Sequence, residues 1–241
     1  MSRYVVQAGW DDVPHLSEEA KEEIGKGLLP HQRDARMKGI PSLGSGAIYP
    51  VPEEDVVCKP FKIPPYYAKA YALDVGWRCT AGIWGAWDRD NDIIYCYSEH
   101  YRGHAEPSVH AAAIQARGKW IKGAIDPASR GRSQVDGRTL IDQYERAGLL
   151  LEPANNAVEA GLLEVYQRLS TGRLKIFTTL EKTLGEYRIY RRDEKGKIVK
   201  QNDHLMDALR YLVMMMHEIA QTAPVNKGRG YSTIADRTVG Y

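Results

Sequence analysis

Three apolar runs follow one another closely in the first half of the chain. They cover residues 70–75, 80–87 and 92–99, and only short polar turns separate them. Apolar runs of this length, joined by short turns, are typical of β-strands that pair with their immediate neighbours. The pattern therefore predicts an antiparallel meander of three strands.

The second half of the chain alternates helices and strands. Apolar residues at helical spacing predict helices, and short apolar runs predict strands. The expected helices cover residues 108–119, 139–147, 157–169 and 203–219, and the expected strands cover residues 121–125, 149–151 and 174–177. Residues 187–192 and 197–201 are expected to form a hairpin. An antiparallel meander followed by parallel βα units, in one mixed sheet flanked by helices, is the element order of the RNase H-like α/β fold.

The two ends of the chain lack this patterning. Residues 1–60 are rich in proline, glycine and charge, with a single helix predicted over 18–26 after Ser17, a common N-cap residue. This segment is expected to be a connector. The polar, glycine-containing stretch 221–241 is expected to be a flexible tail, which leaves 61–220 as the domain that contains the sheet.

Composition narrows the function classes. The 33 Lys and Arg residues nearly balance the 31 Asp and Glu residues, so a nucleic-acid surface must come from local clusters of charge. The three cysteines form no CxxC pair, which favours a reducing compartment over disulfides or a zinc site. No apolar run reaches the roughly 18 residues that span a bilayer. A soluble, cytoplasmic protein with no membrane partner is expected.

Two aspartates stand at the ends of expected strands. Asp74 ends the run Tyr-Ala-Leu-Asp, and Asp126 follows the run Gly-Ala-Ile. The carboxyl ends of parallel strands open onto the crevice in which ligands bind. The two carboxylates are therefore expected to share one site, although they lie far apart in sequence.

Further candidates lie at the start of the last expected helix. His204 and Asp207 are three residues apart, and Asp203 and Asp207 are four apart. Residues at these spacings lie on the same side of a helix. The start of this helix can therefore complete a cluster with the two strand-end aspartates.

Such a cluster has a specific chemical use. Carboxylates held together repel one another and need a cation. Mg²⁺ and Mn²⁺ prefer oxygen ligands, and Mn²⁺ also accepts imidazole. Two such ions roughly 3.5–4 Å apart can activate water and stabilise the leaving oxygen in phosphodiester hydrolysis. Taken singly, each aspartate is more often a turn residue or a helix cap, whereas jointly and in this order they favour a metal site.

The same residues resemble the nuclease motifs of the large terminase subunit of tailed bacteriophages. The matching motifs are Ala-Leu-Asp-Val-Gly around Asp74, Ile-Asp-Pro around Asp126 and Asp-His-Leu-Met-Asp-Ala-Leu-Arg-Tyr around Asp207, and the similarity covers nearly the whole chain. The resemblance implies that these aspartates hold two Mg²⁺ or Mn²⁺ ions, with His204 as an additional ligand. Glu99, at the end of the third expected strand, is a further acidic candidate.

The resemblance also implies a function. It is that of an endonuclease that cuts double-stranded DNA with little sequence preference, trimming concatemeric viral DNA during genome packaging in the cytoplasm of the infected bacterial host. The implied partners are double-stranded DNA, the terminase ATPase domain, the small terminase subunit and the portal. Residues 10–17 and 36–50 resemble the segment that joins ATPase to nuclease. The sequence has no GxxxxGK[ST] phosphate loop, so ATP is not expected as a cofactor.

Two rival functions remain open. One is another enzyme on the same fold, a junction resolvase or a transposase, which would cleave selected DNA structures or join strands. The other is a non-catalytic module that binds DNA or the portal and whose acidic cluster is only structural. Fold alone does not decide among them.

Basic residues mark two candidate DNA surfaces. Six of them fall within the expected hairpin region and are candidates for phosphate contacts: Arg188, Arg191, Arg192, Lys195, Lys197 and Lys200. A solvated hairpin face would explain the same pattern. The second group is Arg130, Arg132 and Arg138, which are expected either to bind phosphate beside the metals or to pair with Asp136 and Asp142. For His100 and His104, four residues apart, a structural or exposed role is expected.

Overall fold

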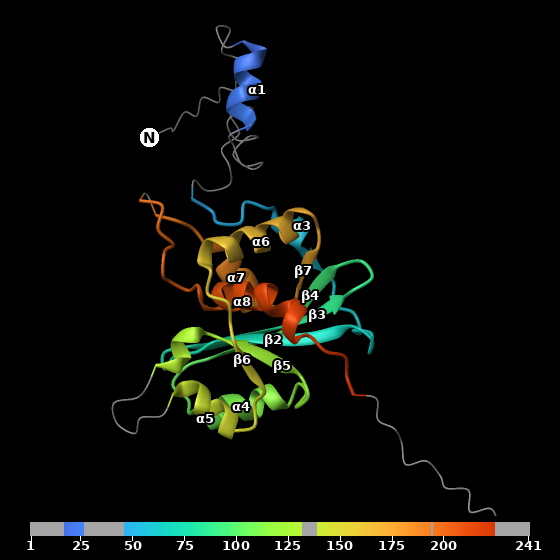
Figure 1. Ribbon diagram of the computed structural model, residues 1–241, viewed down its shortest axis with the longest axis vertical. Coiled ribbons are helices and arrows are strands. Elements are labelled where there is room, and N and C mark those ends of the chain that lie inside the picture. The colour runs from blue at the N-terminus through green and yellow to red at the C-terminus, as the bar shows by residue number, and fades with distance from the viewer. Residues whose placement is uncertain (1–16, 27–45, 132–138, 194, 225–241) are drawn as a thin grey trace, which may run out of the picture.

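A computed structural model of the chain describes residues 17–26, 46–131, 139–193 and 195–224. Its centre is one mixed sheet of seven strands in the order β1-β7-β4-β3-β2-β5-β6 (Figure 1). The strands are β1 Val57–Cys58, β2 Ala68–Asp74, β3 Thr80–Asp88, β4 Ile93–Arg102, β5 Lys122–Ile125, β6 Leu151–Pro153 and β7 Leu174–Phe177. The helical elements are α1 Glu18–Lys26, α3 Glu53–Val56, α4 Pro107–Gln115, η2 Pro127–Arg130, α5 Leu140–Arg146, α6 Val158–Ser170, α7 Glu181–Ile189 and α8 His204–Ile219.

The predicted meander is confirmed. Strand β2 pairs antiparallel with β3, and β3 pairs antiparallel with β4. Nearly every residue of β3 is buried, because this central strand is covered on both faces of the sheet. Its continuous apolar run, from Thr80 to Trp87, is the sequence signature of that position.

The parallel part of the sheet is confirmed as well. Strand β5 pairs parallel with β2, β6 pairs parallel with β5, and β7 pairs parallel with β4. The chain thus has the RNase H-like mixed sheet that the element order predicted. The short strand expected at 149–151 lies slightly later, at Leu151–Pro153.

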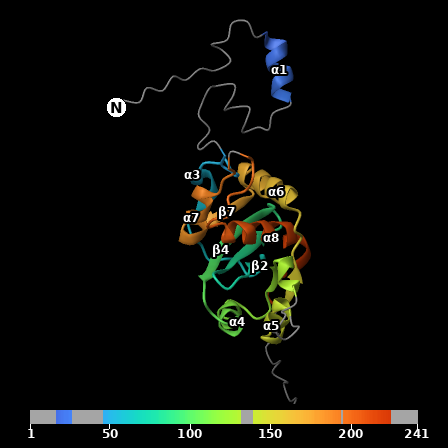
Figure 2. The ribbon, with the colours of Figure 1, turned by 90° about the vertical axis from the view of Figure 1, so that its left-hand side faces the viewer.

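Helices cover both faces of the sheet in two separate layers. Figures 1 and 2 show α6, α7 and α8 on one face and α4 and α5 on the other. The first layer buries side chains such as Leu209, Leu212 and Met216 of α8. The second layer encloses Tyr71, Trp84 and a smaller apolar cluster. Fully burying one large apolar side chain contributes roughly 1.5–3 kcal/mol, so both layers help to fix the sheet.

One close approach within the sheet requires a glycine. Gly123 of β5 lies against the ring of the fully buried Tyr71 of β2, and a Cβ at this position would lie 2.2 Å from that ring. The Tyr71 ring is itself stacked on Trp84, with 5.4 Å between the ring centroids. The side chain of Tyr71 therefore occupies the space that any larger residue at position 123 needs.

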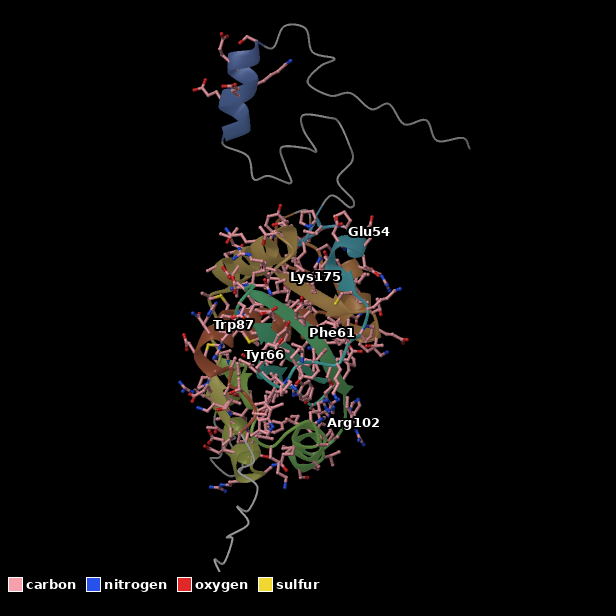
Figure 3. All side chains as sticks on the ribbon, turned by 90° about the vertical axis from the view of Figure 1, so that its right-hand side faces the viewer. Glu54, Phe61, Tyr66, Trp87, Arg102 and Lys175 are labelled. Atoms are coloured by element: carbon pink, nitrogen blue, oxygen red, sulfur yellow. The ribbon has the colours of Figure 1, made fainter. Side chains whose placement is uncertain are left out.

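Residues 46–60 form part of the packed domain, although they fall within the range expected to be a connector. Tyr49 and Val56 are buried in the core, and strand β1 pairs parallel with β7. Beside them, Phe61 packs on Tyr95 and Phe177, with ring centroids 5.0 and 5.2 Å away (Figure 3). Residues 1–16 and 27–45 of the expected connector lie outside the described residues.

The hairpin expected over 187–192 and 197–201 forms only near its turn, where Arg192 and Ile198 make an isolated antiparallel bridge and the amide of Val199 donates to the carbonyl oxygen of Arg191 at 3.0 Å. The first half of its first arm, residues 187–189, is wrong, because it belongs to helix α7. Leu184 and Tyr187 of α7 are buried at helical spacing, so packing of this face overrides the local strand preference of the sequence.

The expected tail also begins with ordered contacts. Gln221 forms a bridge with Lys69 of β2, while residues 225–241 lie outside the described residues. Among the described residues, every helix is too short or too polar to cross a membrane.

Candidate active site

The sheet brings Asp74 and Asp126 together. Leu73 of β2 is in register with Ile125 of β5, and the amide of Asp126 donates a hydrogen bond to the carbonyl oxygen of Leu73 at 3.0 Å. The two aspartates therefore leave neighbouring parallel strands at the same edge of the sheet. This is the edge at which ligands bind in α/β sheets.

Helix α8 reaches both aspartates from one face. His204 Nδ1 lies 2.7 Å from Asp74 Oδ2, and the Tyr211 hydroxyl donates to Asp126 Oδ1 at 3.3 Å. His204 and Tyr211 are seven residues apart, so they lie on the same side of the helix. The helix thus places its first two turns over the ends of both strands.

Asp207 lies in the first turn of the same helix and is held by two cations. Lys200 Nζ lies 2.7 Å from Asp207 Oδ2, and Arg210 Nη2 lies 3.1 Å from Asp207 Oδ1. Arg210 is buried, with 2% of its side chain exposed, whereas Lys200 is 63% exposed. Lys200 also pairs with Asp203 at 3.0 Å.

The pKa values of Asp74 and His204 reflect the charged groups that surround them. Burial raises the pKa of Asp74, and the nearby carboxylates of Asp207 and Asp126 raise it further, against the opposing effect of His204. The hydrogen bond to Asp74 in turn raises the pKa of His204. Asp207 and Asp126 are thus close enough to Asp74 to disfavour its charged form.

The donor chemistry of this cluster fits a hard divalent cation, because its groups are carboxylate oxygens and one imidazole. The side chains are nevertheless not arranged around an ion. Within residues 17–26, 46–131, 139–193 and 195–224, no three His, Cys, Asp or Glu side chains form a group that could hold a metal. Asp74 is engaged by His204 instead, and Asp207 by Lys200 and Arg210.

Comparison with known proteins decides the family. The model of the terminase RNase H-like domain matches residues 74–216, a span that begins at Asp74 and contains Asp126, His204 and Asp207. The chain belongs to the terminase RNase H-like domain family. A curated relative, the large terminase subunit of Salmonella phage P22, is 35% identical over 225 residues, which are 89% of this chain and 44% of that protein. The chain thus spans a little under half the length of the curated relatives it matches.

Solved structures of terminases share the fold. The nuclease domain of the P22 large terminase superposes with a TM-score of 0.68 at 34% identity, covering 75% of this chain and 96% of that one. The large terminase nuclease from the thermophilic phage G20c with bound magnesium superposes with a TM-score of 0.53 at 12% identity, covering 70% and 96%. At that identity the second likeness concerns the fold alone.

Glu99, the further acidic candidate of the terminase domain, lies near the end of β4 and contacts the start of α7. Its Oε1 accepts a hydrogen bond from the amide of Lys182 at 3.0 Å, and its Oε2 accepts from the amide and the hydroxyl of Thr183 at 2.8 and 2.7 Å. Both oxygens of Glu99 are therefore occupied by the beginning of a helix.

Sequence reasoning missed Glu186 of α7. This buried carboxylate accepts hydrogen bonds from the amides of Leu205 and Met206 through Oε2, at 2.6 and 3.3 Å. The available signal was an acidic residue at the buried helical spacing of Thr183, Leu184 and Tyr187. The hairpin expected in this region obscured that signal.

The basic residues of the terminase domain divide into two groups. Three of the six DNA-binding candidates are engaged by carboxylates: Arg188 pairs with Glu53 at 2.6 Å, Arg192 pairs with Glu159 at 2.6 Å, and Lys200 pairs with Asp207. Among the described residues, Arg191, Lys195 and Lys197 form no ion pair and are exposed. Arg130 is exposed in η2, whereas Arg132, Arg138 and Asp136 lie outside the described residues and Asp142 caps α5.

Additional exposed cations lie at the same edge as Asp74. Arg102 ends β4, and Lys182 is the second residue of α7, with its Nζ 5.9 Å from the ring centroid of Tyr101. The Tyr101 ring lies 6.5 Å from that of His204. Arg102 lies at the periphery of the molecule (Figure 3). These two cations therefore flank the acidic cluster.

His100 pairs with a different histidine from the one noted in the sequence. Its Nε2 lies 2.9 Å from Nδ1 of His110, and both rings are buried. Burial lowers the pKa of His100 to about 4, so this ring is neutral at physiological pH. The exposed His104 instead contacts the ring of Trp77.

Proposed function

We propose that this domain is a metal-dependent endonuclease that hydrolyses phosphodiester bonds of double-stranded DNA with little sequence preference. The observation that carries the proposal is the convergence of Asp74 and Asp126, from adjacent parallel strands, with His204 and Asp207 of α8. Kinship to the P22 large terminase, whose corresponding domain is named a nuclease, supports it.

In this proposal Asp74, Asp126 and Asp207 hold two Mg²⁺ or Mn²⁺ ions, with His204 as an additional ligand. The ions would supply an activated water and stabilise the charge of the leaving oxygen. To become a ligand, Asp207 must exchange its ion pair with Lys200 for a metal. The side chain of Lys200 is 63% exposed, so it can leave Oδ2 of Asp207 for solvent, while the buried Arg210 keeps its contact with Oδ1.

The residues around the carboxylates orient them. The hydroxyl of Tyr211 and the amide of Ala128 both donate to Oδ1 of Asp126, at 3.3 and 3.0 Å. His204 holds Oδ2 of Asp74. These contacts fix the directions of the carboxylates before substrate arrives, and such preorganisation is what a metal-dependent site requires.

The proposed biological role is the cutting of concatemeric viral DNA during genome packaging, in the cytoplasm of the infected bacterial host. Its support is the likeness to large terminase subunits, which are about twice as long as this chain. The proposed partners are double-stranded DNA, a terminase ATPase domain, the small terminase subunit and the portal.

One observation favours a second candidate function. Lys200 and Arg210 both pair with Asp207. Among the described residues, no three His, Cys, Asp or Glu side chains are placed so that they could hold a metal ion. A domain that kept this arrangement would be a non-catalytic module that binds DNA or the portal. Such a module would bind DNA without cutting it.

Incubation with supercoiled plasmid separates the two functions. With Mn²⁺ or Mg²⁺ the domain is expected to nick and linearise the plasmid, and excess EDTA is expected to stop both reactions. Gel electrophoresis of time points measures the rates. Plasmid that stays supercoiled in every metal, while it shifts in a binding gel, would identify the non-catalytic module.

DNA phosphates are proposed to contact the exposed cations Lys195 and Lys197 of the six-residue basic group, together with Arg102 and Lys182 beside the acidic cluster. Each phosphate contact contributes about 0.9 to the slope of log K against log salt. The double variants Lys195→Ala with Lys197→Ala and Arg102→Ala with Lys182→Ala are therefore each expected to lower this slope by roughly 2. Fluorescence anisotropy with labelled duplex in EDTA measures it.

The matched control removes two lysines from the opposite edge of the sheet. Lys122 begins β5 and Lys119 lies three residues before it, so both lie at the other end of this short strand from Asp126. The variant Lys119→Ala with Lys122→Ala changes net charge equally and is expected to keep the wild-type slope. An equal loss in all three double variants would mean that binding depends only on overall charge.

A further inference from the structure

Helices α7 and α8 share an unusual feature at their beginnings. The first amides of a helix lack partners within the helix and are usually capped by the side chain of the residue just before it. Neither Leu180, before α7, nor Asp203, before α8, makes such a hydrogen bond. In both helices a glutamate from another element of the fold takes that role.

The first of these contacts joins β4 to α7. Glu99 lies near the end of β4 and accepts hydrogen bonds from the amides of Lys182 and Thr183, which lie more than 80 residues later in the chain. Its Oε2 also accepts from the hydroxyl of Thr183, which is fully buried. The start of α7 is thereby fixed to a central strand of the sheet.

The second contact joins α7 to α8. Glu186 accepts hydrogen bonds from the amides of Leu205 and Met206, and these two residues stand between His204 and Asp207. A buried carboxylate at a helix N-terminus is bound by charge-assisted hydrogen bonds and by the helix dipole. Through these two hydrogen bonds Glu186 holds the first turn of α8, which carries the candidate ligands His204 and Asp207.

The N-cap residue of α8 does not replace Glu186 as the acceptor for the first amides of the helix. Asn202 adopts a left-handed conformation, with φ of 52°, and the carboxylate of Asp203 pairs with Lys200. The amides of the first turn thus depend on a distant acceptor.

We propose that Glu186 and Glu99 are positioning residues for the candidate site. Glu186 sets the direction of the first turn of α8, and with it His204 and Asp207, while Glu99 holds α7 and so holds Glu186. This inference rests on the proposed function for its purpose, since it concerns the same acidic cluster. The hydrogen bonds on which it is based join protein groups only, so they can be tested without metal or DNA.

Hydrogen exchange of the metal-free protein tests the second contact. The variant Glu186→Ala is expected to speed exchange of the Leu205 and Met206 amides by roughly 10-fold or more, because a hydrogen bond to a charged group is lost. Glu186→Gln keeps an acceptor oxygen and is expected to change exchange less. Amides later in α8, such as Leu212, are expected to stay near wild type.

A destabilised control separates positioning from general stability. Ile114 is buried in the layer on the other face of the sheet, so Ile114→Ala lowers stability without touching α7 or α8. It is expected to leave the exchange of Leu205 and Met206 no faster than that of the rest of α8. If Glu186→Ala raises exchange evenly along α8, as general destabilisation does, the positioning role is refuted.

Glu99→Ala tests the first contact. It is expected to speed exchange at Lys182 and Thr183 and also at Leu205 and Met206. Faster exchange at Lys182 and Thr183 alone would refute the part assigned to Glu99. In the plasmid assay, Glu186→Ala is expected to cut roughly 10- to 100-fold more slowly, as variants of residues that orient ligands do. Failure of wild type to cut would overturn the proposed function, whereas the exchange result stands by itself.

Discussion

Asp74→Asn is expected to lower metal-dependent plasmid cleavage by at least about 100-fold. Loss of a residue that merely orients a metal ligand typically costs about 10- to 100-fold in affinity or activity, so loss of a ligand should exceed this range. Asparagine keeps the size of the side chain and an acceptor for His204, but it removes the charge that a divalent cation requires. The rate of loss of supercoiled plasmid, in saturating Mn²⁺ or Mg²⁺, measures the effect.

The same loss is expected for Asp126→Asn and Asp207→Asn. The control is Asp90→Asn, because Asp90 is an exposed residue of the turn after β3, at the opposite end of the sheet from Asp74. Duplex binding in EDTA is expected to be equal or tighter in every variant, since each loses a negative charge. Cleavage at the wild-type rate by Asp74→Asn would mean that Asp74 is not a metal ligand.

Gly123→Ala is expected to destabilise the domain by about 3 kcal/mol, the upper end of the usual range for over-packing a core. The new methyl group would meet the ring of Tyr71 at 2.2 Å, and this ring is confined by the stacked Trp84. For a domain of this size the loss corresponds to a fall in Tm of roughly 6–12 °C, measurable by calorimetry.

Two further variants check that the ring of Tyr71 is the cause. Gly185→Ala in α7 places its methyl group where no atom lies within 4 Å, so it is expected to keep or raise the wild-type Tm. Combining Tyr71→Leu with Gly123→Ala should destabilise less than the sum of the two single variants, because the smaller side chain makes room. If the losses of stability of the two single variants are strictly additive in the double variant, the ring of Tyr71 is not the source of the strain.

The central sheet was predictable because its signals are local. Each strand of the meander pairs with the next one along the chain, so run length and turn spacing identify both the strands and their order. Asp74 and Asp126 meet because β2 and β5 are parallel neighbours, which follows from the element order. The metal-binding roles of these residues stay predictions.

The errors arose where distant contacts decide the structure. Tyr187 and Ile189 have side chains that favour strands, yet Leu184 and Tyr187 bury a helical face against the core. The two residues of β1 are too few to show any periodicity, and their partner strand lies far along the chain. Glu186 and Glu99 bind backbone amides, which nearly every residue type presents, so the sequence does not show which amides these carboxylates bind.

Strand β1 also has a consequence for how the domain assembles. Val57 and its partner Ile176 in β7 are about 120 residues apart, whereas the strands of the meander follow one another directly. The entropy lost on closing a loop grows with its length, and distant pairings slow folding. On a ribosome, residues 57–58 emerge long before the strand that receives them. The earliest-made strand of the sheet is therefore expected to dock among the last, leaving the edge of β7 open until it arrives.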